Sequence, residues 1–387
     1  MTATSLPQRI LSFSLEDRIV YIPTRPGFAD WDAIPPSVSL ISHAATIAPN
    51  ERVLLSPCGH GILGVWAAQY TEPNLITLCE VNWVAFQVAR HLLAQEGLEQ
   101  VSLQPGIAPK ASEAMFDVIL FPIPKGRALA RLYLDGFARL LRPGGRLYIS
   151  GATKAGVKSV IRDALLLFEK KRVLAYKKGC RVVLLYKGAA SKESLPSSHQ
   201  VPRFHTFAVE IKGQKLAIFS QPGIFSWQHL DPGTRLLLEH LSVRPDESIL
   251  DVGCGYGVIG MYAAKQALQG HADLVDVDIL ACDCARRGLI ANRIKNAQVI
   301  WEDALELLGE ERYSLIVSNP PFHIGHRVDL QMAQTFISRA HRALLPRGRL
   351  ILVANRFLPY DKLLHRHFPS VDIPVQTPQY RVFAAGR

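Results

Sequence analysis

The sequence lacks the signatures of several protein classes. It has six cysteines but no Cys-x-x-Cys pair and no partner histidine at zinc-ligand spacing, which argues against a zinc site and a disulfide framework. The longest uncharged run, 53–71, is interrupted by Ser56-Pro57-Cys58-Gly59-His60-Gly61, so it does not predict a membrane span. Residues 1–10 carry no basic segment followed by an apolar core, the pattern of a secretory signal. These absences predict a cytoplasmic protein with reduced thiols, no metal ion and no membrane partner.

Acidic residues are also scarce. Asp+Glu number 33 against 44 Lys+Arg, a formal net charge of +11, which favours a polyanionic partner. The length of 387 residues and the hydrophobic content of 48% predict two or three domains with packed cores.

Much of the positive charge lies in residues 151–190, which hold ten basic residues against Asp163 and Glu169. A solvated helix face would look the same, but we interpret this density as a surface that contacts phosphates. Its candidate contact residues are Lys154, Lys158, Lys170, Lys171 and Arg172.

The chain contains one sequence pattern twice, at a constant offset along the chain. A chance similarity would not keep one register over such a length, so the repeat predicts two copies of one domain. The matches run from Pro26-Gly27, Trp31, 52–61 and 78–82 to Pro222-Gly223, Trp227, 248–257 and 274–278.

Strand and helix patterns alternate within each copy, which predicts an α/β fold with a mostly parallel sheet and helices on both faces. Ahead of the second copy, 204–211 and 214–220 flank Lys212-Gly213 as a hairpin, and the tail 369–385 gives two extended pieces around Pro374 and Pro378. In the second copy we expect strands near 247–252, 272–277, 297–301, 313–318 and 348–354, and helices near 257–269, 279–293 and 329–344.

A glycine-rich loop, 251–257, closes the first strand of the second copy and opens a helix. Gly253 and Gly255 let the backbone approach a ligand, and the N–H groups of the helix start point at it. Asp251 lies at the strand end, Asp276 ends the next strand where a carboxylate can accept ribose hydroxyls, and Asp303 follows the third. Each aspartate could instead be a helix N-cap. The loop fits a dinucleotide as well as an adenosyl ligand.

The Asn319-Pro320-Pro321-Phe322 stretch follows the apolar run 313–317 and Ser318, which we interpret as a buried parallel strand. The two prolines stiffen the turn, so that the Asn319 side-chain oxygen and a backbone carbonyl can accept hydrogen bonds from one amino group. Phe322 can then cover the face of a planar ring. An ordinary turn would account for the same residues, so the neighbouring motifs must decide between a turn and a functional site.

The first copy has lost these residues. Leu55 and Pro57 stand in place of the loop's carboxylate and first glycine, and 121–125 occupies the place of 318–322. Of the three candidate carboxylates of the second copy, only Asp276 has an acidic counterpart in the first copy, namely Glu80. We infer a degenerate domain in 1–187, a serine- and proline-rich linker in 188–203, and a catalytic domain in 204–387.

The second half resembles the RsmC/RlmG-type ribosomal RNA guanine-N2 methyltransferases, and Gly151 to Ser159 resembles the first-domain motif of that family more weakly. The resemblance implies a tandem duplication of a Rossmann-like class I methyltransferase fold, with a seven-stranded sheet whose last strand is antiparallel. It also implies S-adenosylmethionine as the cofactor, with Phe225 and Asp231 near it. The segments that carry the resemblance are 223–226, 230–234, 251–257, 319–325 and 353–360.

These observations predict methyl transfer to the N2 amine of an unpaired guanine in ribosomal RNA, with the 16S RNA of the small subunit as the expected target, by a monomeric enzyme. Asn319 and the Pro320 carbonyl would accept from the amine, Phe322 would stack on the base, and Asn319 would also border the cofactor. His323 would touch the RNA or cap a turn. The alternatives are a 23S RNA target, an adenine N6 or protein glutamine acceptor, an NAD enzyme, and a non-catalytic RNA-binding assembly factor.

Overall fold

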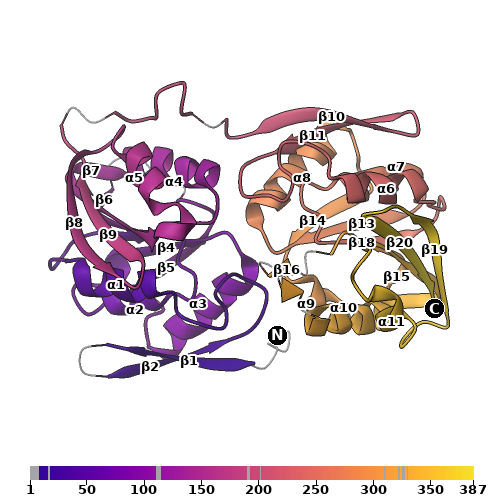
Figure 1. Ribbon diagram of the computed structural model, residues 1–387, viewed down its shortest axis with the longest axis horizontal. Helices are drawn as coiled ribbons and strands as arrows, with labels where there is room; N and C mark the ends of the chain where they lie inside the picture. Colours follow the sequence, from indigo (N-terminus) through magenta and orange to yellow (C-terminus); the bar gives the residue numbers. More distant parts are fainter. Residues whose placement is uncertain are drawn as a thin grey trace. The chain divides into compact units, whose positions relative to one another are not determined.

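The computed structural model describes residues 8–15, 18–109, 115–189, 192–200, 202–308, 311–320, 323–324, 327–328 and 330–387. The chain divides into two compact units, Met1–Arg203 and Phe204–Arg387 (Figure 1).

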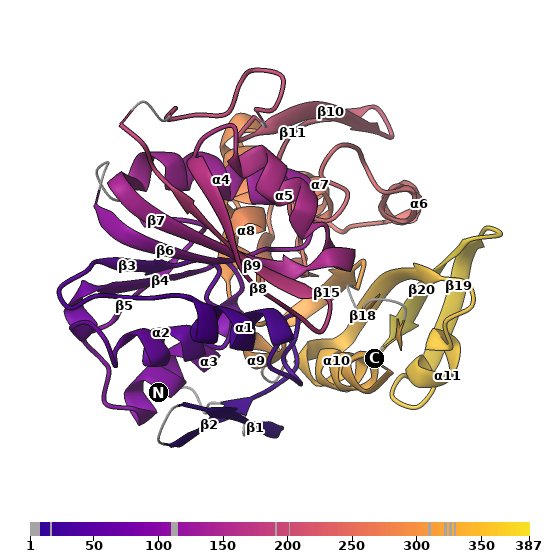
Figure 2. The ribbon, with the colours of Figure 1, turned by 60° about the vertical axis from the view of Figure 1, so that its left-hand side comes forward.

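The first unit is built on a seven-stranded sheet with the order β5-β4-β3-β6-β7-β9-β8. Neighbouring strands run parallel from β5 to β7, and β9 runs antiparallel to both of its neighbours. Helices α1, α2 and α3 cover one face, and α4 and α5 cover the other (Figure 2). The elements are β1 (Arg9–Ser14), β2 (Ile19–Thr24), α1 (Pro36–Ala44), β3 (Val53–Leu55), α2 (Ile62–Ala67), η1 (Pro73–Leu75), β4 (Ile76–Glu80), α3 (Trp83–Gln95), β5 (Ser102–Pro105), β6 (Phe116–Pro122), α4 (Arg127–Leu140), β7 (Leu141–Ala152), η2 (Thr153–Ala155), α5 (Val157–Ala164), β8 (Glu169–Lys177) and β9 (Cys180–Tyr186).

The second unit repeats this architecture in the order β14-β13-β12-β15-β18-β20-β19, with β20 as the antiparallel strand. The hairpin of β10 and β11 packs on α8, beside which it lies in Figure 1. The elements are β10 (His205–Ile211), β11 (Gln214–Ser220), α6 (Pro232–His240), β12 (Ser248–Val252), α7 (Val258–Gln266), β13 (His271–Asp276), α8 (Ile279–Ala291), β14 (Ala297–Trp301), α9 (Ala304–Leu307), β15 (Tyr313–Ser318), β16 (His323–Ile324), β17 (Arg327–Val328), α10 (Leu330–Ala343), β18 (Leu344–Asn355), α11 (Tyr360–Leu364), β19 (Ser370–Gln376) and β20 (Tyr380–Gly386).

The offset between the two copies changes at the segment that begins with Asn319. Helices α3 and α8 begin and end at positions related by the offset of the sequence repeat, whereas α4 and α10, and likewise β7 and β18, are related by a larger one. The sheet registers pair Leu55 with Leu120 and Asp251 with Val317, so Phe121 is the equivalent of Ser318. The second copy therefore carries extra residues between β15 and α10, in the segment that begins with Asn319.

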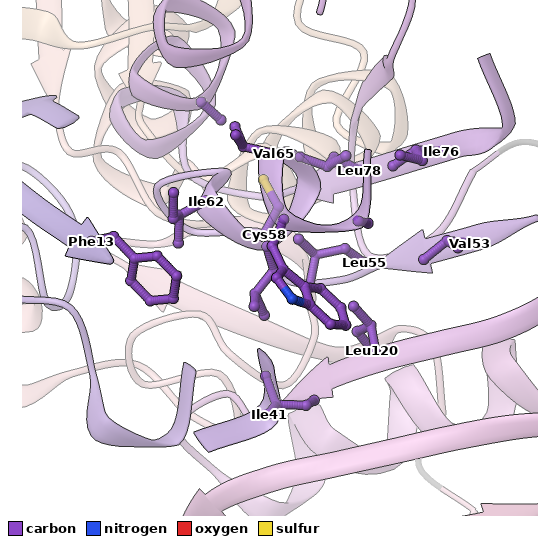
Figure 3. Close-up of a cluster of buried hydrophobic side chains, with 14 of the residues drawn as sticks. Phe13, Ile41, Val53, Leu55, Cys58, Ile62, Val65, Ile76, Leu78 and Leu120 are labelled. Carbon is purple, nitrogen blue, oxygen red and sulfur yellow. The ribbon is translucent and has the colours of Figure 1, made fainter. Parts of the chain in front are cut away.

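Both cores lie between the sheets and their helices. Strands β3, β4 and β6 are largely buried on both faces, as expected for central strands of a parallel sheet with helices on both sides. In the first unit, Leu55, Cys58 and Ile62 belong to one apolar cluster, so the start of the degenerate loop is part of the core (Figure 3). In the second unit, the core includes Phe336 and Leu350.

The predicted fold is confirmed, down to the antiparallel last strand of each sheet. The predicted hairpin is β10 and β11. Pro374 lies within β19, at an irregularity in the pairing with β20, and Pro378 lies between the two strands. In the second unit, helices α6, α9 and α11 have no counterpart among the sequence-based predictions. Within the described residues, no helix is long and apolar enough to cross a membrane, and no group of His, Cys, Asp and Glu is arranged to hold a metal ion.

Candidate active site

The candidate site is built on the carboxyl ends of β12, β13, β14 and β15. These four strands run parallel, so the residues that follow them gather at one edge of the sheet. The buried Ser318 hydroxyl donates to the Val252 carbonyl at 2.8 Å and ties the end of β15 to the end of β12. The glycine loop and the Asn319 turn therefore start from two neighbouring strands that are fixed to each other.

The glycine loop has the backbone that its sequence predicts. Gly253, Gly255 and Gly257 have φ angles of +68°, +56° and +82°, a region that favours glycine. A Cβ on Gly257 would lie 2.9 Å from that of Ala285, so α7 and α8 could not pack as they do with a larger residue there. A Cβ on Gly255 would meet nothing within 4 Å, which leaves this part of the loop open to a ligand.

Asp251 is a fully buried carboxylate at the end of β12. Its Oδ2 accepts from the Gly260 backbone N–H at 2.7 Å, whereas its Oδ1 is buried and has no hydrogen-bond partner among the described residues. Burial raises the pKa of the Asp251 carboxyl to about 7, and the nearby charge of Asp276 adds to the rise. Asp251 is not the N-cap residue of α7, although its Oδ2 binds an N–H in the first turn of that helix, and its second oxygen, a buried acceptor without a donor, points to a ligand.

Asp276 holds the glycine loop. One oxygen accepts from the Gly255 N–H at 2.8 Å and the other from the Asp278 N–H at 2.9 Å, while burial raises the pKa of the carboxyl. Glu80 makes the corresponding bond to the Gly59 N–H, also at 2.8 Å. Because both copies keep this bond, it belongs to the fold, and it does not by itself mark a ligand site.

Two further predicted cofactor residues have different surroundings. Asp303 is the N-cap of α9, where its side chain accepts from the Leu305 N–H at 3.0 Å. Phe225 is 68% exposed, which is unusual for a large apolar side chain.

Asn319 is held in a defined orientation by α6. Its Nδ2 donates to Asp231 Oδ2 at 3.1 Å and contacts Thr234 Oγ1 at 2.9 Å. Asp231 is also the N-cap of α6 and accepts from the Thr234 backbone N–H at 2.8 Å. A carboxylate only accepts hydrogen bonds, so the amide nitrogen must face Asp231 and the amide oxygen must point away from it. Asp231 thus contacts the predicted acceptor motif directly.

A hollow of about 600 Å³, within the usual size range of ligand pockets, lies beside β18, the neighbour of β15. It is at the carboxyl end of β18 and the start of β20, where Phe357 is 77% exposed. The hollow is on the side of Asn319 away from the glycine loop, because β18 and β12 flank β15 on opposite sides. Its lining residues are Asn355, Arg356, Phe357, Pro378, Gln379 and Tyr380.

Part of the predicted motif lies outside the described residues, namely Pro321 and Phe322. Pro320 is described and buried, and the backbone of His323 is in β16.

Sequence reasoning missed the roles of Thr234 and of the residues around Phe357. Both were within reach, because 230–234 and 353–360 are among the segments that carry the family resemblance. The amino-acid sequence alone did not show that Thr234 contacts Asn319 or that Phe357 is exposed.

The loop of the first unit differs from that of the second in its side chains, whereas a Cβ on Gly59, like one on Gly255, would meet nothing within 4 Å. The Ser56 hydroxyl donates to the Ile107 carbonyl at 2.7 Å and links the ends of β3 and β5. His60 is buried, packs edge-on against Phe28 with ring centroids 5.0 Å apart, and has its pKa lowered by burial to about 4. With Leu55 in place of the buried carboxylate, this loop offers no acceptor like that of Asp251.

The predicted phosphate-contacting residues are all exposed. Lys154 lies in η2, Lys158 in α5, and Lys170, Lys171 and Arg172 in the edge strand β8.

Comparisons with known proteins agree with this arrangement. The sequence profile described as methyltransferase small domain matches residues 25–183 and again 215–384. A ribosomal RNA small subunit methyltransferase C of Hamiltonella defensa is 33% identical over 92% of this chain and 99% of its own length. The enzyme of that name from Psychromonas ingrahamii is 32% identical over 70% of this chain and 76% of its own.

A solved structure covers the whole architecture. It is the T. thermophilus 16S rRNA N2 G1207 methyltransferase in complex with AdoMet and guanosine. It superposes with a TM-score of 0.80 over 99% of both chains at 29% identity.

Proposed function

The chain belongs to the methyltransferase small domain family, and from this premise we propose that it transfers a methyl group from S-adenosylmethionine to the exocyclic N2 amine of a guanine in 16S ribosomal RNA. The observation that carries the proposal is the Asn319 amide, which Asp231 orients beside an intact glycine loop. The relatives that match the chain over most of their length act on small-subunit ribosomal RNA by name, which supports the choice of substrate.

The residues of the second unit fit the cofactor. Asp251 has a buried Oδ1 without a partner among the described residues, which suits a donor of the bound molecule. The open backbone around Gly255 admits a ligand, and the Asp276 carboxylate retains an acceptor site for a ribose hydroxyl beyond the backbone N–H groups of Gly255, Val277 and Asp278. When bound, S-adenosylmethionine supplies an electrophilic methyl group on a sulfonium.

Asn319 prepares the acceptor amine. The lone pair of the guanine N2 amine is delocalised into the ring, so the amine is a poor nucleophile. In our proposal the Asn319 Oδ1 and the Pro320 carbonyl accept the two N–H groups of the amine and stabilise the positive charge that develops on nitrogen as it attacks. Because Asp231 and Thr234 already hold the amide, little reorganisation remains at the moment of reaction.

The hollow beside β18 suits the base. Phe357 offers an exposed aromatic face, and the Arg356 guanidinium and Gln379 amide offer hydrogen-bond donors at the same place. Stacking on an aromatic ring contributes roughly 1–3 kcal/mol per base. The target guanine must be unpaired, or turned out of its helix, to reach this edge of the sheet.

The remaining assignments belong to the same proposal. The first unit contributes RNA contacts through its basic surface. The enzyme works as a cytoplasmic monomer on the small ribosomal subunit or its RNA, and no metal ion takes part.

The test uses purified protein, isotopically labelled S-adenosylmethionine, and small-subunit RNA and particles that lack the modification. The wild-type protein should label one guanine at N2, identified by mass mapping of nuclease fragments. Asn319→Ala should reduce turnover by at least a hundredfold, the order of effect seen when one preorganised group of a charge-stabilising site is removed. Its affinity for the cofactor, measured by calorimetry, should stay within about threefold.

Asn82→Ala is the matched control, because it removes a capping amide in the first unit. It should lower stability and leave turnover unchanged. Labelling of 23S RNA, of an adenine or of a protein glutamine would replace the proposed substrate. Turnover of Asn319→Ala at the wild-type rate would remove Asn319 from the mechanism.

A further inference from the structure

The first unit has a hollow of about 490 Å³ with a cationic rim and an apolar floor. Helix α5 forms one wall, and strands β8 and β9 form the other. Two of the apolar side chains are exposed in spite of their size, Leu165 at 41% and Val173 at 53%. The lining residues are Lys158, Ile161, Arg162, Leu165, Lys171, Val173, Arg181 and Val183.

The second unit is an internal control for three of these four cations, whereas Arg381 stands at the position of Arg181. Helix α11 follows β18 at the same spacing as α5 follows β7, so Asp361 stands where Lys158 does and His365 where Arg162 does. The sheet registers place Val371 at the position of Lys171. The same fold therefore forms without a lysine or arginine at these three positions, which means that packing does not require them.

The positive charge of the hollow is not neutralised locally. Asp163, the acidic residue of α5, is buried and bound by Arg127 and Arg131 on the other side of the helix. Within the described part of the chain, no carboxylate forms an ion pair with any of the four lining cations.

The surroundings of Arg181 indicate what kind of ligand the hollow suits. Its guanidinium lies over the Tyr176 ring, 5.1 Å from the centroid, while its Nε is buried and has no acceptor among the described residues. Tyr176 itself is 63% exposed. A buried guanidinium N–H without an acceptor beside an exposed ring is suited to an anionic oxygen attached to a flat group.

Strand β8 separates the basic residues of this region into two sets. Lys171 and Val173 line the hollow, and Val173 is paired with the lining residue Val183. Arg172 is paired with Leu184, which belongs to the core that faces α1, so its side chain is on the opposite face of the sheet. The hollow is thus a site built on one face, and not a general consequence of a lysine-rich strand.

We propose that this hollow is a secondary binding site for one single-stranded segment of RNA, with phosphates on Lys158, Arg162, Lys171 and Arg181 and a base on the floor of Leu165 and Val173. The proposal rests on the proposed function for the identity of the polyanion. Single strands are favoured over duplexes because their bases are free to lie on an apolar floor. The site would anchor the substrate through the unit that lacks the glycine loop's acceptor.

The experiment measures binding of the full chain to a fluorescently labelled single-stranded RNA copied from 16S RNA, and to the same RNA annealed to its complement, over a range of salt concentrations. The rim variant is Lys158→Glu with Lys171→Glu. Its control, Arg90→Glu with Arg139→Glu, makes the same charge change at exposed positions of this unit outside the hollow. The floor variant is Leu165→Ser with Val173→Ser, both exposed and therefore compatible with folding.

Against its control, the rim variant should bind the single strand at least tenfold more weakly. Its plot of log K against log salt should be shallower by about 1.4, because each phosphate contact on a single strand contributes about 0.7. The floor variant should bind the single strand about fivefold more weakly, because it removes the apolar surface on which the base lies, and should bind the duplex unchanged. All variants should bind S-adenosylmethionine like the wild type.

A rim variant that binds RNA like its control would overturn the proposal, and so would a floor variant with unchanged affinity for the single strand. Equal losses on strand and duplex would reduce the hollow to a general electrostatic surface, which also contradicts the proposal. The proposed function fails separately, if the wild type binds the strand and transfers no methyl group.

Discussion

At the residue scale, Asp231 has two tasks that substitutions can separate. It caps α6, and it holds the Asn319 amide. Asp231→Ser keeps a good N-cap but does not reach Asn319, so it should retain the stability of the wild type and lower kcat about tenfold to a hundredfold by loss of orientation. Asp231→Ala should show the same fall in kcat and a further loss of about 1 kcal/mol in stability. Steady-state kinetics and urea titrations measure both quantities.

The KM for the cofactor is the control for a positioning role, and it should change little in the serine variant. If Asp231→Ser turned over at the wild-type rate, the orientation of Asn319 would not depend on the carboxylate.

The buried Asp251 carboxyl predicts how stability changes with pH in the absence of ligand. Its pKa is about 7 in the folded protein against an ordinary value of 3.8, so the folded chain keeps a proton that the unfolded chain releases between these values. The free energy of unfolding should therefore fall as pH rises from 4 to 7, by up to about 4 kcal/mol from this group, and level off above pH 7. Asp251→Asn has no such proton to lose.

Urea titrations at several pH values test this expectation through the difference between wild type and Asp251→Asn. Glu80, whose pKa is also raised by burial, contributes alike to both proteins, whereas the charge of Asp276 acts on a titrating Asp251 only in the wild type. A difference in stability that did not vary between pH 4 and 7 would contradict a raised pKa at Asp251.

At the scale of elements, α7 and its counterpart α2 are each seated on the sheet through a glycine. A Cβ on Gly260 would lie 2.4 Å from Leu274 Cγ and 3.0 Å from Asp251 Oδ2, and one on Gly64 would lie 2.9 Å from Leu78 Cδ2. Both alanine substitutions should destabilise their own unit by about 1–3 kcal/mol through overpacking. Only Gly260→Ala should also weaken binding of S-adenosylmethionine, because it pushes on Asp251.

Calorimetric titration of both variants at a temperature where each is folded separates the two effects. Equal cofactor affinity in the two variants would mean that the packing of α7 on the sheet at Gly260 does not affect cofactor binding.

The strands and the glycine loop were predictable from sequence because each depends on a short stretch of chain. Buried parallel strands are continuous apolar runs, and the loop needs glycines at fixed spacing. The link from Asp231 to Asn319 was not predictable, because it joins residues 88 positions apart and depends on where α6 packs. The N-cap role of Asp303 could only be stated as an alternative, because the same letters suit a ligand and a helix start.

The basic segment shows the same limit at the element scale. Its net charge was evident from the sequence, but its division into two faces depends on the register of β8 with β9 and on two irregularities in that pairing. Composition does not encode such a register, so Arg162 and Arg181 were not singled out in advance.

At the scale of the whole molecule, the two units predict one cofactor site per chain. In the first unit, Leu55 stands at the place of Asp251 and His60 is buried. The Ser56 hydroxyl donates a hydrogen bond to the Ile107 carbonyl beside the loop. Calorimetry with S-adenosylmethionine should give a stoichiometry near one, and Asp251→Asn should weaken that single site by tenfold or more because its buried acceptor is altered. A stoichiometry near two, or unchanged affinity in the variant, would contradict this division.

The difference in length between the copies has a consequence for how such an enzyme can change over evolution. Four residues separate β6 from α4, whereas eleven separate β15 from α10, and the helix and strand that follow have equal lengths in the two copies. Lengthening a loop this much costs only about 1 kcal/mol of closure entropy. Insertions in this one loop therefore change the stability of the domain little. The residues that select the acceptor can diversify by insertion, while the cofactor pocket is inherited unchanged.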